Sequence, residues 1–572
     1  MTNLHLTFPD YLVIGGYFAI VLWVGFYFRK MLVSTKDYFA GSHQVPWWLA
    51  GISHYMSSFS AFAFIAYAQM GYEYGWVSIT LFWVTVPACI LGGTIFAQRW
   101  RRARIITPIQ FLESRFSPFI RQLFAWAGIP VKIFDDALKV FATGLFLALS
   151  VGISLPVAIV FCGVVMITYT YLGGLWALIV TDFVQFLMKI LAMLLLLPLT
   201  FWAFSSWKSA IHGYPKHFFR LNGGPYGWVY IIGFAVLIAI SYNSTWALAQ
   251  KYYSVRTERD ASKVAYLAAA LNFLGAPLMI LPAIFGRKLL PNLIAQHRTA
   301  DTYVLLVLRF LPVGMVGIIV AAMFSATMAT VSADFNAIAS VLTQDVYHRL
   351  INPLAKERAL VTIGKLNTLI LGVLTVGLSL WIAFSHQESL FHMMVTVFGL
   401  FIAPTFLPLL AGLTIERITW KGALVGFVAG LFTGIVMLAL QTWYLPHVPG
   451  ISHEFANYTF EGISILLNTA VTILGMWAGS VWLPATSEEW TRIEDFFRNL
   501  KRPITSEEVP EKRTISPGPA IAWATIGVAV LLIVAGFWSD LAVARSIDLV
   551  AGAILLTIGI VIRRRDKAAR GD

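Results

Sequence analysis

Charged residues are scarce in this chain. Asp, Glu, Lys and Arg make up 12% of its 572 residues, whereas 58% are hydrophobic and the mean hydropathy is +0.76. A soluble protein of this size needs many more charges to cover its surface, so the composition excludes one. The sequence therefore predicts a polytopic membrane protein.

Cysteine is nearly absent as well. Cys89 and Cys162 both lie in apolar runs, which indicates small buried residues and no disulfide framework. The chain shows no phosphate loop, no metal-ligand spacing and no nucleophile constellation, so we expect neither an enzyme nor a cofactor. The first apolar run, from residue 9, lacks a basic leader and a small-residue cleavage site, and we expect it to be a retained helix.

Long apolar runs are what the chain has in abundance, and they predict an all-α fold. A helix of about 20 residues crosses the hydrocarbon core of a bilayer, and fifteen runs are suitable. The expected helices are 9–29, 46–70, 74–97, 122–150, 155–172, 175–204, 228–248, 262–286, 312–344, 360–384, 389–414, 421–443, 461–483, 519–537 and 545–562. Between the fifth and sixth, Gly173 and Gly174 are expected to form a tight turn.

The basic residues predict the orientation of these helices. With the N-terminus outside, the connections on the cytoplasmic side and the C-terminal tail hold 30 of the 41 Lys and Arg residues, and the opposite connections hold 8. Basic residues favour cytoplasmic loops, so we expect an inner (cytoplasmic) membrane protein with its C-terminus in the cytoplasm. This asymmetry explains the net charge of +13 without a nucleic-acid partner.

The segment from Pro46 to Gly75 is apolar but has a polar centre, formed by Ser53, His54, Ser57, Ser58 and Ser60. A helix can open inside a membrane only where it faces protein or a wet cavity, and a broken helix at mid-depth is typical of a binding site. The alternative is a continuous helix whose serines pack against neighbouring helices.

Ionisable residues within the spans are functional candidates, because an unpaired charge is costly there. Asp182 suits a cation, and the alternative is an ion pair with Lys189, two turns further on.

In the fourth helix, Asp135 and Lys139 are four residues apart, as are Lys132 and Asp136, so two ion pairs can form along one helix. The alternative is that Lys139 or Asp136 contacts a polar or ionised group of a solute.

The ninth helix offers a third polar region. Ala326, Ala329 and Thr330 share one face, where small side chains allow close approach of another helix, and Thr330 and Ser332 supply hydroxyl groups. Such a face can hold a hard cation such as sodium, or it can simply pack.

Four stretches together resemble the sodium:solute symporter family, and the resemblance covers about residues 9–440. They are STKDYFAGSHQVPWWLAG, YLGGLWALIVTDFVQF, MATVSADFNAIASVLTQDVY and PTFLPLLAGLTIERITWKGAL. The resemblance implies a LeuT-like fold, in which a leading helix precedes two inverted five-helix repeats whose first helices are broken. The second broken helix would contain the polar residues from Ser241 to Thr245.

The domains expected from this resemblance and from composition follow the chain. They are 1–45, a leading helix and cytoplasmic loop; 46–227 and 228–415, the two repeats; 416–483, two additional helices; 484–518, a polar cytoplasmic linker with a short amphipathic helix and a flexible connection; and 519–572, two C-terminal helices and a basic tail.

The resemblance also implies a sodium site. Met56 and Phe59 would contribute carbonyl oxygens from the second helix, and Ala326, Ala329 and Thr330 would contribute from the ninth. Ala329 stands where relatives have a second hydroxyl residue. A possible second sodium would use Asp182 and Ser332, although Ala329 and Ala333 replace serines expected beside them.

For the solute, Ala63 and Phe82 replace the glutamine and glutamate of sugar-binding relatives, which argues against a galactose-type site. The expected solute-binding residues are Ser57, Ser58, Ser60, Asp136, Lys139, Tyr242, Asn243 and Asn272. We therefore expect a monomeric importer of an anionic or polyhydroxy solute, sialic acid-like or sugar-like, coupled to sodium by alternating access. The alternatives are a proton-coupled carrier that uses Asp182 or Asp136, and a membrane sensor of the solute.

Overall fold

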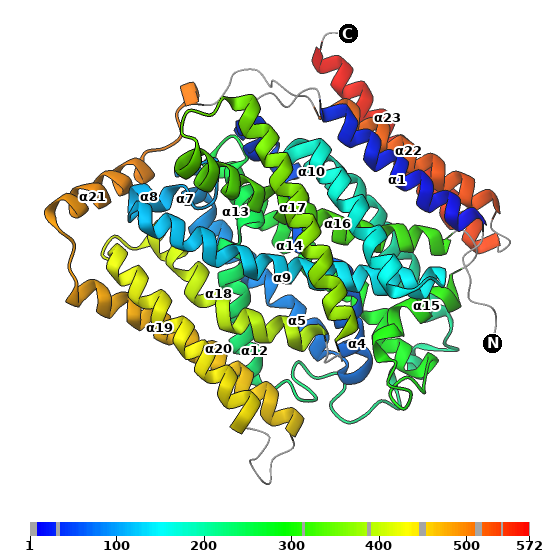
Figure 1. The fold of residues 1–572 in the computed structure, drawn as a ribbon. Helices are drawn as coiled ribbons and strands as arrows, with labels where there is room; N and C mark the ends of the chain where they lie inside the picture. Colours follow the sequence, from blue (N-terminus) through cyan, green and yellow to red (C-terminus); the bar gives the residue numbers. More distant parts are fainter. Residues whose placement is uncertain are drawn as a thin grey trace.

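The computed structural model describes residues 8–29, 35–311, 315–385, 390–444, 453–508, 517–538 and 542–570. Within these ranges the chain is helical and has no strand beyond two isolated bridges, which confirms the all-α prediction (Figure 1). Ten helices are long and apolar enough to cross a membrane, and three further helix pairs qualify together but are bent by more than 40°. The protein is therefore a multi-pass membrane protein.

The helices are α1 (Phe8–Arg29), α2 (Thr35–Ala40), α3 (Trp47–Ser57), α4 (Ala61–Tyr74), α5 (Val77–Trp83), α6 (Thr85–Leu91), α7 (Ala97–Arg102), α8 (Phe111–Arg115), α9 (Pro118–Val151), α10 (Leu155–Trp202), α11 (Trp207–Ile211), α12 (Trp228–Ser244), α13 (Trp246–Tyr253), α14 (Glu258–Leu289), α15 (Thr302–Phe310), α16 (Met315–Val341), α17 (Glu357–Phe384), α18 (Leu390–Thr414), α19 (Trp420–Ala439), α20 (His453–Trp482), α21 (Ser487–Lys501), α22 (Gly518–Trp538) and α23 (Ala542–Arg570).

The predicted turn at Gly173 and Gly174 is wrong. Helical hydrogen bonding continues through both residues, so the two helices expected there form the single 48-residue helix α10. Glycine in a helix costs only about 1 kcal/mol relative to alanine. The packing of α10 against α1, α9 and α16 outweighs a penalty of that size.

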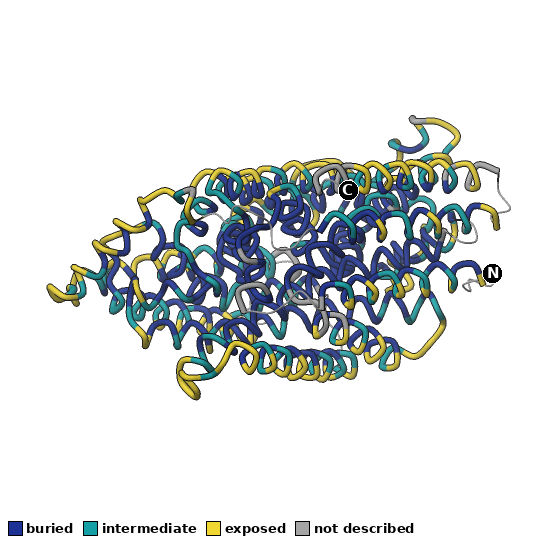
Figure 2. Tube along the Cα trace, turned by 90° about the horizontal axis from the view of Figure 1, so that it is seen from above, coloured by how far each residue is buried: buried dark blue, intermediate teal, exposed yellow. Residues whose placement is uncertain are grey.

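The core is built around α16, which is buried along its whole apolar length. Its small residues, among them Ala322, Ala326 and Ala329, let α10, α9 and α1 pack closely on it. Figure 2 shows this arrangement, with buried backbone through the middle of the molecule and exposed backbone at its periphery. The centre of the bundle is therefore the place where side chains from several helices can meet.

Two helix pairs lie at opposite edges of the view in Figure 1. On one side, α22 and α23 pack together, and α22 lies along α1, where the rings of Phe8 and Trp538 are 6.5 Å apart. On the other, α19 packs against α20 through glycines four residues apart. A Cβ added to Gly422 would lie 2.5 Å from the carbonyl oxygen of Met476, so only glycine allows this approach.

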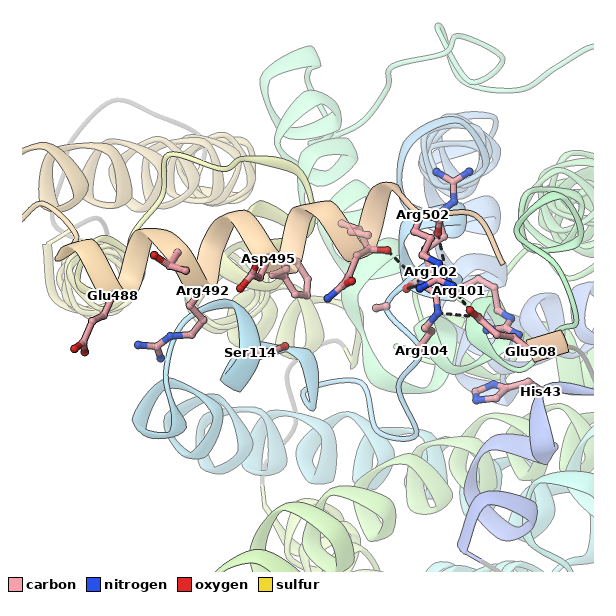
Figure 3. A pocket seen from close by; sticks show the side chains of 15 residues that line it. His43, Arg101, Arg102, Arg104, Ser114, Glu488, Arg492, Asp495, Arg502 and Glu508 are labelled. Carbon is pink, nitrogen blue, oxygen red and sulfur yellow. Dashed lines mark hydrogen bonds and ion pairs between the residues drawn. The ribbon is translucent and has the colours of Figure 1, made fainter. Parts of the chain in front are cut away.

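The polar linker contains the predicted amphipathic helix, α21, while the flexible connection predicted after it lies largely at 509–516, outside the described residues. Arg104 fixes the end of α21. Its guanidinium donates to the Glu508 carboxylate at 2.8 and 3.1 Å and to the carbonyl oxygens of Asn499 and Pro503 at 3.3 and 3.1 Å (Figure 3). The hydrogen bond from Arg104 lowers the pKa of the Glu508 carboxyl below its ordinary value.

We expect Arg104→Ala to loosen the linker. Because the contacts are partly exposed, the loss in docking free energy should be about 1–2 kcal/mol. Limited proteolysis of the linker should then be roughly 5- to 30-fold faster. Arg545→Ala, on α23, is the control; equal cleavage of the Arg104 variant and wild type would contradict the docking role.

Candidate functional site

The centre of the molecule contains two broken helices. Between α3 and α4, Ser58 has φ −103° and ψ 2°, Ser60 is extended, and the two helices are bent by 57°. Between α12 and α13, Thr245 is extended and the bend is 50°. The break at residues 58–60 excludes the continuous-helix alternative for the first segment. The second break falls in the polar stretch from Ser241 to Thr245, as expected.

The first break places backbone groups against α16. Thr330 Oγ1 lies 3.1 Å from the carbonyl oxygen of Met56, 3.0 Å from that of Phe59 and 3.0 Å from that of Ala326. One turn earlier, Thr327 Oγ1 accepts a 2.8 Å hydrogen bond from the amide of Ala61. Two threonines thus satisfy polar groups on both sides of the break, as a membrane interior requires.

The Met56, Phe59, Ala326 and Thr330 oxygens form what we call the carbonyl cage. The cage has three carbonyl oxygens and one hydroxyl, and none of its four residues carries a carboxylate. A neutral oxygen set suits a monovalent hard cation better than a divalent one, which usually binds carboxylates. Ala329, the remaining residue of the expected site, is buried beside the cage with a methyl group in place of a hydroxyl.

The structure does not join the residues of the possible second sodium site. The Ser332 hydroxyl donates to the carbonyl of Met328 in its own helix, whereas Asp182 accepts a short hydrogen bond from Ser53 on α3. The carboxylate therefore anchors the broken helix, and nothing among the described contacts links it to Ser332.

The alternative ion pair between Asp182 and Lys189 is also not formed in the described part of the chain. The Lys189 ammonium instead lies 3.7 Å from the ring centroid of Tyr55 and 3.6 Å from that of Phe59. A cation over two aromatic faces is stabilised without an acceptor oxygen. No sequence pattern predicts this contact, because it depends on how α10 is rotated against α3.

A buried ion cluster joins α9 to α16. Lys132 and Lys139 each lie 2.7 Å from Asp135, so the predicted Asp135–Lys139 pair is present, but Lys132 meets Asp135 rather than the predicted Asp136. Both lysines also contact Asp334, at 2.8 and 3.2 Å, and Lys139 lies 3.3 Å from Asp136. Residues three apart in a helix lie on the same face, so Lys132 can reach Asp135, and Asp334 of α16 contacts the same ammonium group.

Asp334 is the functional candidate that sequence reasoning missed. A signal for it exists, since Asp334 follows Thr330 by four residues and so lies on the same face of α16. We call Lys132, Asp135, Asp136, Lys139 and Asp334 the ion cluster.

A cavity of about 110 Å³ lies between the carbonyl cage and the ion cluster. Its lining joins the first break to α9, α12, α16 and α18. It includes the expected residues Ser57, Ser58, Ser60, Lys139 and Tyr242, the further ionised residues Lys132, Asp135 and Asp334, the hydroxyls of Thr85, Ser241, Thr245 and Thr330, and the aromatic rings of Phe62, Tyr67, Phe82, Phe234 and Phe398. Asp136 is fully buried behind this lining.

Two expected solute residues, Asn243 and Asn272, are not among the residues that line this cavity. The Asn243 amide donates to the carbonyls of Ala88 and Ala239 at 3.0 and 2.8 Å, which ties α12 to α6. The Asn272 amide donates to the carbonyl of Ala268 at 2.9 Å, within α14. Both side-chain amides therefore donate to backbone carbonyls.

A larger groove of about 990 Å³ lies away from the broken helices, between α21 and the segment around α7 and α8 (Figure 3). Three of its arginines already have partners. Arg101 donates to the carbonyls of Val255 and Arg256, Arg102 pairs with Glu258 at 3.2 Å, and Arg104 holds Glu508. The groove is thus the docking region of the linker, and the smaller central cavity is the candidate site.

Residues 38–430 match the family model described as the sodium:solute symporter family. The chain belongs to this family. The sodium/sialic acid symporter SiaT of Proteus mirabilis is 24% identical over 443 residues, which cover 74% of this symporter and 88% of that protein. The sodium/glucose cotransporter of Vibrio parahaemolyticus is 26% identical, with 75% and 86% covered.

The fold of this symporter also has a solved counterpart. The substrate-bound, outward-open structure of a Na⁺-coupled sialic acid symporter superposes with a TM-score of 0.69 at 23% identity, covering 82% of this chain and 98% of that one. At this level of identity the likeness concerns the fold, and it agrees with the predicted LeuT-like architecture.

We expect Asn243→Ala to lower stability without changing which solute binds. The variant removes the two buried hydrogen bonds that the Asn243 side chain donates, one of which joins α12 to α6, at a cost of about 1–3 kcal/mol. Thermal unfolding and solute binding should be measured on the same preparation. Asn457→Ala, at a half-buried position on α20, is the control. A changed order of solute preference would return Asn243 to the binding site.

Proposed function

We propose that this protein is a secondary active transporter that imports a small organic solute together with sodium by alternating access. The observation that carries the proposal is the convergence of the Met56, Phe59 and Ala326 carbonyls on the Thr330 hydroxyl. Membership of the sodium:solute symporter family supports sodium as the ion. The match to Na⁺-coupled relatives that differ in their solutes supports it further.

In this mechanism sodium is held by the carbonyl cage, with Ala329 contributing its backbone carbonyl, and it bridges the broken helix to α16. Sodium then favours the conformation in which α3, α4 and α16 are joined, and it orders the serines of the break that line the solute cavity. The coupling free energy equals the difference in sodium affinity between the two conformations. A membrane potential adds about 2.3 kcal/mol per charge per 100 mV to inward movement.

The solute class follows from the relatives and from the cavity. The named relatives carry sialic acid and glucose, which are anionic and polyhydroxy solutes. Here the cavity presents Ser57, Ser58, Ser60 and Tyr242, whose hydroxyls can both donate and accept. Aromatic rings such as Phe82 and Phe398 offer apolar faces to a sugar-like ring.

We propose the predicted topology as well, with the N-terminus outside, the C-terminus in the cytoplasm of a cell with an inner membrane, and two repeats at 46–227 and 228–415. Each repeat begins with a broken helix. Two contacts support this topology. The Arg104–Glu508 pair joins the basic end of α7 to the linker, and the Phe8–Trp538 contact joins the start of α1 to the end of α22 that lies away from the linker. We also propose that the protein functions as a monomer.

A proton-coupled carrier is the second candidate. It is favoured by Asp136, whose Oδ2 is buried without a hydrogen-bond partner in the described chain. Uptake of glucose and N-acetylneuraminate into proteoliposomes, driven by an imposed sodium gradient or by a pH gradient alone, separates the two. Uptake driven only by the pH gradient would overturn sodium coupling. Tight binding without accumulation would point to a sensor instead.

We expect Thr330→Ala to weaken sodium binding at least 10-fold, because the cage loses its hydroxyl. The stabilisation of the purified protein by sodium chloride, relative to potassium chloride, measures this without knowledge of the solute. Thr330→Ser should retain most of the effect, and Thr362→Ala, exposed on α17, is the control. An unchanged sodium response in Thr330→Ala would rule out the cage.

We expect Ala329→Ser to strengthen sodium binding by about 3- to 10-fold, because it supplies a further oxygen, and a factor of 10 corresponds to about 1.4 kcal/mol. The same sodium titration checks the result. Ala339→Ser, nearly three turns further along α16, is the control. Weaker sodium binding in Ala329→Ser at unchanged unfolding temperature in potassium would contradict the proposed position of the ion.

A further inference from the structure

The ion cluster contains one carboxyl group more than it has ammonium groups. It contains three carboxylates, Asp135, Asp136 and Asp334, and two ammonium groups, Lys132 and Lys139. Side-chain exposure is 11% or less for all five. In a membrane interior the surplus carboxyl group is ionised only when a further cation neutralises it. Among the described residues the lysines are the only cations in contact with these carboxylates.

Each lysine is held by at least two of these carboxylates. Lys132 contacts Asp135 and Asp334 at 2.7 and 2.8 Å, and Lys139 contacts the same two and Asp136. An anionic solute would have to compete with at least two carboxylates for each ammonium group. The cluster is therefore poorly suited to binding a solute carboxylate.

The carboxylates are not saturated. The lysine contacts of Asp135 and of Asp334 use Oδ2, which leaves Oδ1 of each for another donor, and both side chains line the cavity. Asp136 Oδ2 is buried without a partner. Ser57 is an independent observation. The residue is 95% buried and lines the cavity, and its hydroxyl has no hydrogen-bond partner in the described chain. Buried polar groups of this kind need a partner.

The rest of the cavity wall fits a cation. Phe62, Tyr67, Phe82 and Tyr242 line it, and aromatic faces attract ammonium groups as well as binding apolar ones. A protonated amine would thus meet carboxylate oxygens on one side and aromatic rings on the other.

We propose that the cavity recognises a solute that bears a protonated amine, and that the surplus carboxylate of the ion cluster neutralises this amine. The proposal rests on the proposed function, since it names the solute of the same site. It narrows the polyhydroxy class to amine-bearing members and disfavours purely anionic ones. Asp135 and Asp334 contact the amine, and Asp136 acts through the net charge of the cluster.

The experiment uses the purified full-length protein in sodium chloride and measures thermal unfolding with a panel of small amines. Each amine is paired with the same molecule carrying a hydroxyl or an acetamide group instead; D-glucosamine with D-glucose and N-acetyl-D-glucosamine is one such set, and N-acetylneuraminate represents the anions. We expect at least one amine to bind 10-fold or more tightly than its paired molecules. Binding confined to neutral or anionic members, equal binding within pairs, or no binding by any amine overturns the proposal.

Variants test the origin of the preference. Asp136→Asn removes the surplus carboxyl group. We expect this variant to reduce the preference for the amine over the paired molecule that carries a hydroxyl group at least 10-fold, while the response to sodium remains. Asp495→Asn, exposed on α21, is the matched control. Asp334→Asn tests the contact with the amine directly. If this variant fails to fold because it disturbs the lysines, Asp136→Asn and the wild-type panel still test the proposal. An unchanged preference in Asp136→Asn contradicts the role of the cluster.

The proposed function and this inference fail separately. Sodium-driven uptake of a neutral or anionic solute retains the symporter and rejects the amine. Selective binding of an amine that is unaffected by replacing sodium with potassium retains the amine and rejects sodium coupling.

Discussion

The structure depends on satisfying backbone polar groups where two helices open inside an apolar bundle. A carbonyl or amide without a partner is expensive in hydrocarbon, so a break is stable only if another element supplies partners. Here α16 does so with two threonines one turn apart: Thr327 accepts from the amide of Ala61, and Thr330 reaches the carbonyls of Met56 and Phe59. The same oxygens that stabilise the break are those that can bind an ion.

This requirement explains why α16 is central and rich in small residues. A threonine hydroxyl reaches the backbone of another helix only if the two helices are close, and Ala326 and Ala329 allow that distance. Thr327 Oγ1 also lies 2.6 Å from Thr143 Oγ1 on α9, so α9 is fixed to α16 at the same level. The ion cluster then joins the same two helices around Asp334.

Much of this could be predicted from the sequence, because composition and periodicity decide which segments enter the membrane. The serines between Ser53 and Ser60 marked the first break, and the family resemblance placed Met56 opposite Thr330. The direction in which a side chain points around its helix axis was harder to predict. Asn243 and Asn272 are both polar, yet the Asn243 amide donates to the Ala88 carbonyl of α6 and the Asn272 amide donates to the Ala268 carbonyl one turn earlier in α14.

Contacts between distant helices account for the remaining differences. Asp334 changes the pairing of Lys132, because a carboxylate from α16 reaches a lysine that α9 alone would direct to Asp136. The Lys189 ammonium lies over aromatic rings of α3, where a reading of α10 alone suggests an ion pair with Asp182. At Gly173 and Gly174 the backbone preference for a turn is small compared with the packing of a long helix.

The arrangement along α16 finally suggests how an ion and a solute can be coupled in one molecule. Thr330 belongs to the carbonyl cage and Asp334 to the ion cluster, and they stand one turn apart on one rigid helix. Movement of α16 relative to α3 and α4 would change the distance to the Met56 and Phe59 carbonyls, and movement relative to α9 would change the lysine contacts of Asp334. A ligand bound at either place therefore biases the position of the same helix, which is the physical condition for coupling two sites.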